Sequence, residues 1–169
     1  PTCLTIQCQA IYAHRSVEKA KALREKRERR ELREAKEKIK TRRDYLKEAQ
    51  VAFNAFIRQR DQGKPCICCG KPLASTGVGG GFDCGHYRSA GSAPHLRFDE
   101  RNAHGQAKQC NRYGAGRAVD YRLGVIARIG LAAVEDLEAD QEPRKWSAEE
   151  LKAIRDTYRA KLKAMKAAA

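Results

Sequence analysis

The feature that most constrains this chain is a long stretch without a helix-breaking residue. Between Ser16 and Arg60 the sequence contains neither glycine nor proline and is dominated by Ala, Leu, Glu, Lys and Arg. These residues have the highest intrinsic preference for the α-helix, and Ser is a favoured N-cap. The stretch therefore predicts one long helix that is capped by Ser16 and ends near Arg60.

The two halves of this predicted helix differ in surface character. From Arg24 to Arg30 there is no apolar residue, and opposite charges stand four residues apart, which is typical of a solvated helix. The second half carries an apolar stripe that has to pack on another surface. We expect that surface to be the domain that follows, and a homodimer formed through the stripe is the other arrangement we consider. The stripe consists of Leu46, Ala49, Phe53, Phe56 and Ile57.

The charge balance points to a polyanionic partner. The chain has 35 Lys and Arg against 21 Asp and Glu, a formal net charge of +14 over 169 residues. A surplus of this size favours nucleic acid as the first partner to consider. No apolar stretch approaches the roughly 18 residues of a membrane-spanning helix, and the basic helices lack a bulky apolar face. We therefore expect a soluble protein with no membrane partner.

The cysteines are concentrated in the middle of the chain. Their total of seven is odd, and no signal peptide precedes them. This usage is typical of a reducing compartment and of metal binding rather than of a disulfide framework. We expect a cytoplasmic protein that binds zinc. The central cysteines are Cys66, Cys68, Cys69, Cys84 and Cys110.

The segment "CICCGKPL" has the spacing of a zinc knuckle. Cys66 and Cys69 stand three residues apart, so that a tight turn can present both thiolates to one tetrahedral zinc. Gly70 tolerates the backbone twist that turns amide groups toward the sulfurs. Further on, "GQAKQCN" supplies Cys110 but has Ala107 where a second such pair would begin. The pattern predicts a structural zinc site that is one ligand short.

The fourth zinc ligand is left open by the spacing. Cys84 and His104 are equally good candidates, and three cysteines with a water molecule are a further arrangement. Cys68 is the least suitable because neighbouring residues on a knuckle point in different directions. Cys84 and Cys68 can also be read as small buried apolar side chains.

The stretch "GGGFDCGHYRSAG" carries residues suited to phosphodiester hydrolysis. That reaction needs an activated water, a general base and a cation that neutralises charge on the phosphate. Asp83 offers a hard oxygen to Mg²⁺ or Mn²⁺, and His86 offers a base. On a regular strand these two side chains point to opposite faces, but Gly85 can break the alternation. Further polar candidates are Asn102, His104 and Asn111.

The remainder of the chain predicts short elements and then helices. "PHLRF" reads as a strand segment within the glycine-rich region. "GRAVDYRLGVIARIG" places Val119, Leu123, Ile126 and Ile129 at near-helical spacing, with Gly130 as the stop, and "LAAVEDLEAD" follows as a second short helix. A last helix begins with a capping box of Ser147 and Glu150 and has an apolar stripe. The stripe consists of Leu151, Ile154, Tyr158 and Leu162.

An ordered series of motifs resembles one family. "DCGHYRS", "PHLRF", "NAHGQ", "CN", "YR" and "RIG" follow each other as in the NinG (Rap) family of lambdoid phage recombination proteins, over about residues 45–165. That family is related to HNH nucleases, which have a zinc-stapled ββα-metal fold similar in layout to phage endonuclease VII. The resemblance implies an endonuclease that cuts branched DNA, such as Holliday junctions and D-loops, in the cytoplasm of the bacterial host.

The resemblance also implies roles for single residues. Asp83 and Asn111 would bind the catalytic Mg²⁺ or Mn²⁺, and His86 would be the general base. Cys66, Cys69 and Cys110 would hold the zinc. His104 would serve either site.

Three further residues of the matching motifs have less specific roles. Asn102 would orient the loop by hydrogen bonds. Arg88 and Arg97 would grip the scissile phosphate, or equally would be general DNA or surface contacts. The chain departs from the family pattern at two positions: Ala107 replaces a zinc cysteine that is usual in the family, and Cys84 replaces a small residue such as Ala. Either Cys84 takes the place of the lost zinc ligand, or the zinc site is weakened and the protein is less stable.

These observations predict an α+β fold that is mostly helical, with a small zinc-stapled ββα-metal (HNH, treble-clef-like) core flanked by long basic helices. Residues 61–130 would form the core, between the basic helix at 16–60 and the C-terminal helices at 131–169. Residues 1–15 resemble the second half of an N-terminal zinc finger, on account of Cys3 and Cys8. The alternative function is a non-catalytic zinc module that binds DNA or structured RNA.

Overall fold

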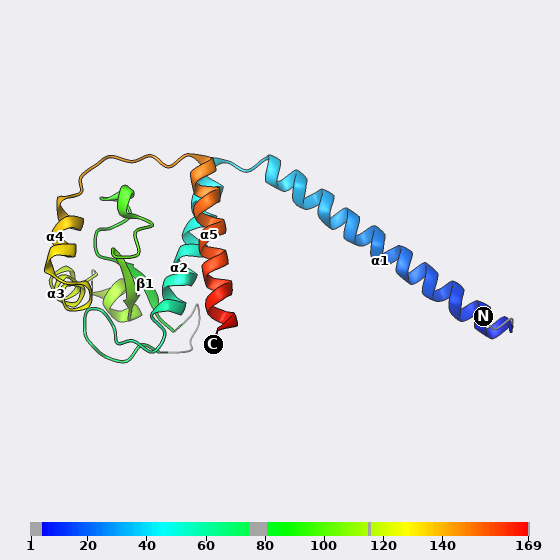
Figure 1. Cartoon of the computed structure of the whole chain (residues 1–169), viewed down its shortest axis with the longest axis horizontal. Coiled ribbons are helices and arrows are strands. Elements are labelled where there is room, and N and C mark those ends of the chain that lie inside the picture. The colour runs from blue at the N-terminus through cyan, green and yellow to red at the C-terminus, as the bar shows by residue number, and fades with distance from the viewer. Residues whose placement is uncertain (1–4, 75–80, 115, 169) are drawn as a thin grey trace. The chain divides into compact units, whose positions relative to one another are not determined.

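The computed structural model describes residues 5–74, 81–114 and 116–168. Helices dominate, and one pair of strands completes the architecture, which confirms the mostly helical α+β fold (Figure 1). The chain divides into two compact units, Pro1–Thr41 and Arg42–Ala169. In chain order the elements are α1 (Ile6–Lys38), α2 (Arg42–Arg60), β1 (Asp83–His86), the 3₁₀ turn η1 (Pro94–Leu96), β2 (Ala103–Gln106), the π-helical turn η2 (Gln109–Tyr113), α3 (Ala118–Ile129), α4 (Leu131–Ala139) and α5 (Ala148–Ala167).

The first unit is a single helix, α1, and the prediction of one unbroken helix from Ser16 to Arg60 is wrong. The N-cap is Thr5, whose hydroxyl accepts a hydrogen bond from the amide of Cys8, while Ser16 lies inside the helix. The helix ends at Lys38 and α2 begins at Arg42. Two β-branched residues, Ile39 and Thr41, stand at the break, and such residues disfavour the helical conformation.

The N-terminal finger remnant at 1–15 is a prediction that falls largely on α1. From Ile6 onward the residues of this range are helical. Cys3, one of the two cysteines on which the prediction rested, lies outside the described residues.

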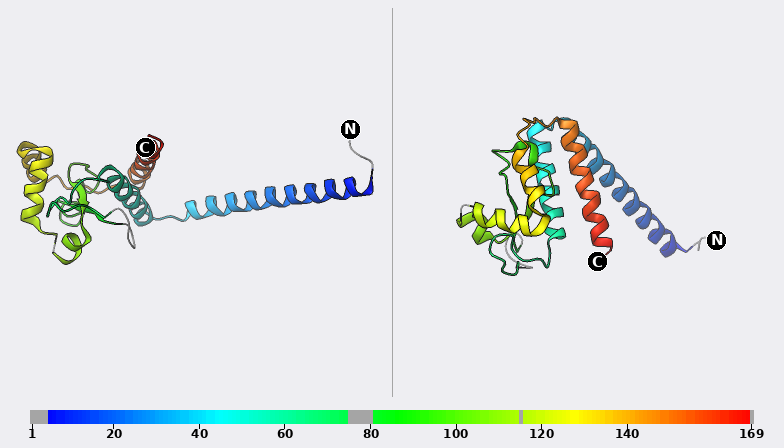
Figure 2. Two further views of the ribbon diagram at one scale, coloured as in Figure 1. Left: turned by 90° about the horizontal axis from the view of Figure 1, so that it is seen from below. Right: turned by 60° about the vertical axis from the view of Figure 1, so that its left-hand side comes forward.

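The second unit has its main core between α2 and α5, which lie side by side in both views of Figure 2. The ring of Tyr158 meets that of Phe53 edge-on, with centroids 4.9 Å apart. The predicted stripe of α2 is therefore covered by the same chain, as expected for packing on the domain that follows. The capping box of Ser147 and Glu150 at the start of α5 is confirmed. The core residues of the two helices are Tyr45, Ala49, Ala52, Phe53, Phe56, Ile57, Leu151 and Tyr158.

The two strands form an antiparallel hairpin with a continuous register from Asp83 opposite Gln106 to His86 opposite Ala103. The loop that joins them contains η1, so the prediction of a strand at "PHLRF" is wrong. Pro94 has no N–H to give to a strand ladder and instead opens a 3₁₀ turn. Its carbonyl oxygen accepts a hydrogen bond of 3.0 Å from the indole of Trp146.

The predicted helices α3 and α4 are confirmed, with Gly130 between them at a φ of 89°. The buried face of α3 is only partly the one that the apolar spacing indicates, because Ile126 and Ile129 pack against buried clusters but the other two predicted residues do not. Val119 and Leu123 are 74% and 61% exposed, whereas Tyr121 and Val125 are buried. The reason is Gly124, which lies so close to the knuckle that a Cβ there would come within 1.8 Å of the carbonyl oxygen of Ile67.

Among the described residues, none of the helices has the combination of length and apolar character needed to cross a bilayer.

Candidate functional site

The knuckle at Cys66–Gly70 is a tight turn closed by backbone hydrogen bonds. The amide of Gly70 donates to the carbonyl of Cys66 at 3.0 Å, and the amide of Cys66 donates to the carbonyl of Lys71 at 2.8 Å. Gly70 has a φ of 68°, in the left-handed region that glycine adopts without strain. The sequence-based role of this glycine is therefore confirmed.

The three predicted zinc cysteines come together. The sulfurs of Cys66, Cys69 and Cys110 all lie within 4.8 Å of one another, and Cys110 is supplied by η2. Sulfurs around a tetrahedral zinc are roughly 3.8 Å apart, as follows from Zn–S bonds of about 2.3 Å. The cluster is close to that size, so its donors fit zinc.

Backbone amides prepare Cys66 for metal binding. Burial alone would raise the pKa of its thiol, but hydrogen bonds from the backbone of Ala107, Cys69 and Cys68 outweigh burial and lower that pKa. The amide of Ala107 lies 3.3 Å from the Cys66 sulfur. Since the thiolate is the form that binds metal, these amides favour the liganding state.

The structure brings neither Cys84 nor His104 into this cluster, as judged over the described residues. Cys84 packs against the core of α2, and burial raises the pKa of its thiol to about 12. The Nε2 atom of His104 bonds to the carbonyl of Arg101 at 2.9 Å, and its Nδ1 atom lies 3.3 Å from the guanidinium of Arg60. Both ring nitrogens are thus engaged away from the sulfurs.

Cys68 also stands apart from the three sulfurs. The amide of Gln106 donates a hydrogen bond of 2.8 Å to its sulfur, and burial raises the pKa of its thiol to about 12. The structure therefore assigns it a packing contact, in agreement with its low rank as a ligand.

His86 has its tautomer set by a backbone carbonyl. Its Nε2 atom lies 3.0 Å from the carbonyl oxygen of Arg97, which can only accept, so Nε2 carries the proton and a neutral ring keeps its lone pair on Nδ1. Burial, together with the nearby charge of Arg97, lowers the pKa of His86. The ring stands 6.0 Å from that of Phe53. His86 is therefore a neutral imidazole with a basic nitrogen at neutral pH.

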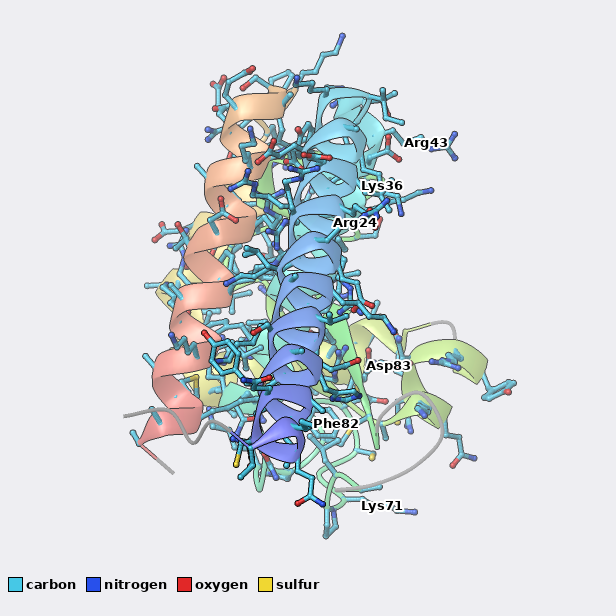
Figure 3. The ribbon with its side chains drawn as sticks, turned by 90° about the vertical axis from the view of Figure 1, so that its right-hand side faces the viewer. Arg24, Lys36, Arg43, Lys71, Phe82 and Asp83 are labelled. Atoms are coloured by element: carbon cyan, nitrogen blue, oxygen red, sulfur yellow. The ribbon has the colours of Figure 1, made fainter. Side chains whose placement is uncertain are left out.

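Asp83 lies on the opposite end of β1, where it is labelled in Figure 3. Asn111 donates a hydrogen bond of 3.1 Å to its carboxylate, and Arg112 binds the same carboxylate through two nitrogens at 2.8 and 2.9 Å. Burial would raise the pKa of Asp83, but the contacts with Arg112 and Asn111 outweigh it and lower that pKa. Asp83 is thus ionised and paired with residues of η2.

Asp83 and His86 do not converge in the way that a break at Gly85 would allow. The hairpin register is continuous through Gly85, and the two side chains bond to different partners. Asn111 connects the two residues. It donates a hydrogen bond to Asp83, and together with His86 it lines one hollow of about 400 Å³ that also includes Ser89 and Tyr121. The hydroxyl of Tyr121 supports this region by donating to the carbonyl of Gly85 at 2.8 Å.

Comparison with known proteins shows the family to which the chain belongs. The model of the family described as Bacteriophage Lambda NinG protein matches residues 3–168. The chain belongs to the NinG family. It is 47% identical to Protein ninG of Salmonella phage P22 over 125 residues, which are 74% of this chain and 59% of that protein. Protein ninG of Escherichia phage lambda is 45% identical over 125 residues, again 74% and 59% of the two chains.

The matched part of this NinG chain therefore spans less than two thirds of the length of these relatives. The expected family membership is confirmed, and with it the origin of the relatives in phages. No solved structure matches the chain.

The two arginines expected to grip a phosphate have partners inside this member of the NinG family. The guanidinium of Arg88 donates to the carbonyls of Leu137 and Glu138 at the end of α4, at 3.4 and 3.1 Å. That of Arg97 donates to Gln50 at 3.0 Å and to the carbonyl of Ala90 at 2.9 Å. In this structure both side chains hold the hairpin loop in place, and contact with a phosphate stays a prediction.

Asn102 has the orienting role that its motif indicates. It is fully buried, its carbonyl oxygen accepts from the amide of Arg88 at 2.8 Å, and its own amide donates to the carbonyls of Arg88 and Leu96 at 3.0 Å each. One side chain thereby ties the start of the hairpin loop to its middle.

Spacing and motifs do not identify a second buried polar centre, at Asp61. This carboxylate is fully buried and accepts from the amide of Gly105 at 2.8 Å, while Arg60, Lys64 and Arg128 approach it from three sides. Burial would raise its pKa, yet these donors hold the pKa well below its usual range. Asp61 fixes β2 against the end of α2. Arg60 and Lys64 are its neighbours in the sequence, but Gly105 and Arg128 come from distant elements, so no local motif identifies this centre.

Proposed function

We propose that this NinG family protein is a metal-dependent DNA endonuclease that cuts branched recombination intermediates such as Holliday junctions and D-loops. Its HNH-like core would consist of the hairpin, η2 and the three-cysteine zinc site. The observation that carries this proposal is His86, a neutral imidazole with its lone pair on Nδ1, placed on a hollow that it shares with Asn111. A base of this kind is what removes a proton from an attacking water.

The metal-binding side of the proposed site would consist of Asp83 and Asn111. A bound Mg²⁺ or Mn²⁺ would neutralise charge that develops on the phosphate. Asp83 is ionised and would hold that ion together with the side-chain oxygen of Asn111, the kind of hard ligands such ions prefer. The Arg112 guanidinium, which is half exposed, occupies the carboxylate in this structure and would have to turn away.

The three cysteines would position this constellation rather than react. A zinc held by Cys66, Cys69 and Cys110 would join the knuckle to η2, the element that carries Asn111. The formal net charge of +14 supports DNA as the substrate.

Cleavage of a synthetic four-way junction in the presence of Mg²⁺ or Mn²⁺ tests the proposal. We expect His86→Ala and Asp83→Asn to lower the cleavage rate by at least about 100-fold, since general base and metal contributions are of that order. His95→Ala is the matched control, because His95 also bonds to a backbone carbonyl, that of Asp140 at 2.9 Å, but does not line the hollow.

The control variant should cut at a rate close to that of the native chain. Equal loss in all three variants would mean that folding, and not chemistry, had been disturbed. A native protein that binds junctions but never cuts them with either metal would favour the alternative, a non-catalytic zinc module that binds DNA or RNA. The bidentate contact of Arg112 with Asp83 is the observation that favours this alternative, because it leaves the carboxylate already paired.

A further inference from the structure

The helix α1 has an unusually ordered distribution of charge. Three arginines form ion pairs with glutamates four residues later: Arg24 with Glu28 at 2.9 Å, Arg27 with Glu31 at 3.4 Å and Arg30 with Glu34 at 3.7 Å. These pairs occupy successive positions around one part of the helix. The charge on the other side of α1 is therefore set by the remaining Lys and Arg residues.

Five of those remaining cations fall on one side of α1, which we call the cationic stripe. They follow each other at steps of three, four or seven residues, and at 3.6 residues per turn they lie within about 80° of arc. The one other residue in that arc between the ends of the stripe is Ala22, so no glutamate interrupts it. The stripe consists of Arg15, Lys19, Lys26, Arg29 and Arg33.

The stripe is exposed, and its side chains are not engaged in ion pairs. No residue described in α1 is buried. Across the described part of the chain, none of the five stripe residues takes part in an ion pair, in contrast to the three arginines beside them. A row of unpaired like charges raises the energy of the free protein and is relieved by a polyanion.

The apolar residues of α1 exclude two other partners for this surface. Ile11, Val17, Leu23 and Leu32 are all exposed, but they point to different sides of the helix and form no seam. A coiled coil with a second copy and insertion into a membrane surface both require such a seam. A second copy would also bring two cationic stripes together.

We propose that the cationic stripe of α1 is a contact surface for the phosphate backbone of duplex DNA, separate from the hollow at His86. From Arg15 to Arg33 the stripe is about 27 Å long, at 1.5 Å per residue. It therefore matches roughly eight base pairs of duplex, at 3.4 Å per base pair. Contacts of this kind give affinity without reading sequence, which suits a protein that recognises branched DNA by its shape. The choice of DNA rests on the function proposed above.

Two triple variants of the full chain test this inference with the same change in net charge. The stripe variant is Lys26→Gln, Arg29→Gln and Arg33→Gln, and the control is Arg24→Gln, Arg27→Gln and Arg30→Gln on the ion-paired side. Gln has nearly the same helix preference as Lys and Arg, so both variants should keep α1 intact, which circular dichroism checks. Binding to linear duplexes and uncut junctions is measured by fluorescence anisotropy with EDTA present.

We expect the stripe variant to bind about 100-fold more weakly at 0.15 M salt, and its slope of log K against log salt to fall by about 3, because three phosphate contacts are lost. The control should lose much less than tenfold. Equal losses in the two variants would show that only net charge matters, and equal affinity of the stripe variant and the native chain would also overturn the inference.

Further measurements test whether the stripe prefers DNA to other polyanions, and they separate this inference from the proposed endonuclease activity. If the stripe variant loses affinity for duplex RNA or for phosphatidylserine vesicles while keeping its affinity for DNA, the inference is overturned. A protein that binds DNA through the stripe but never cuts it refutes the endonuclease proposal alone. A protein that cuts while both variants bind alike refutes the stripe alone.

Discussion

At the scale of single residues, Ala107 is the position where this chain departs most from a complete zinc site. It stands three residues before Cys110, and its amide lies 3.3 Å from the sulfur of Cys66. A side chain at this position therefore begins beside the cluster. The three sulfurs already present have no fourth partner from Cys84 or His104 in the described residues.

We predict that Ala107→Cys raises zinc affinity by roughly tenfold or more, because it restores a second Cys-x-x-Cys pair and a four-thiolate site. Competition with a chromophoric chelator measures the change. Gln109→Cys is the control, since it adds an exposed thiol within η2. Similar affinities of the two variants would show that position 107 does not face the metal.

The residues of the candidate site could be predicted from the sequence, but most of their partners could not. Spacing identified Cys66, Cys69 and Cys110 because zinc ligands come from short local motifs. It could not rank Cys84 against His104, since the contacts that engage them come from α2 and from the loop before β2. Hydrogen bonds between distant elements leave no periodic trace in the sequence.

At the scale of elements, the packing of α3 against the Cys66–Gly70 knuckle depends on a glycine. Gly124 lies against the carbonyl of Ile67 with no room for a methyl group. This contact decides which face of α3 is buried and explains why Val119 and Leu123 are left in solvent.

We predict that Gly124→Ala destabilises the protein by about 1 to 3 kcal/mol, because the clash outweighs the better helix preference of Ala. Urea denaturation measures the free energy of unfolding. Gly91→Ala is the control, as a Cβ there would meet nothing closer than 3.8 Å. If Gly124→Ala proves as stable as the native chain, α3 does not pack on the knuckle in this way.

The sequence predicted those elements whose signals are local. The capping box of α5 and the apolar stripe of α2 both follow from spacing within one helix. The break at Ile39–Thr41 and the 3₁₀ turn at Pro94 were missed, because a stretch of strong helix formers hides two β-branched residues and because "PHLRF" alternates like a strand. The buried face of α3 depends on a neighbour that is more than 50 residues away in the chain.

At the scale of the whole molecule, buried histidines couple stability to pH. His104 is 2% exposed, and burial, aided by the charges of Arg60 and Arg128, lowers its pKa to about 4. Burial also lowers the pKa of His86. Between pH 6.5 and 4 the unfolded chain therefore binds more protons than the folded chain, so stability falls as the pH falls through this window.

We predict that the free energy of unfolding changes little between pH 6.5 and about 8 and that His104 alone removes roughly 3 kcal/mol by pH 4. Urea denaturation at pH 7.5 and at pH 5 measures the loss. His104→Gln should reduce this pH dependence relative to the native chain. An unaltered dependence in His104→Gln would contradict the assignment.

The division of the chain at Thr41 also bears on how such a protein can evolve. The second unit is interlocked through Asp61, Asn102 and the cluster of Cys66, Cys69 and Cys110, so that most changes there must be compensated elsewhere. No described residue of α1 is buried, so natural selection can alter its charges or add and remove whole turns at little cost to the core. Relatives that share the second unit could in this way differ in the length and the charge of the helix that precedes it.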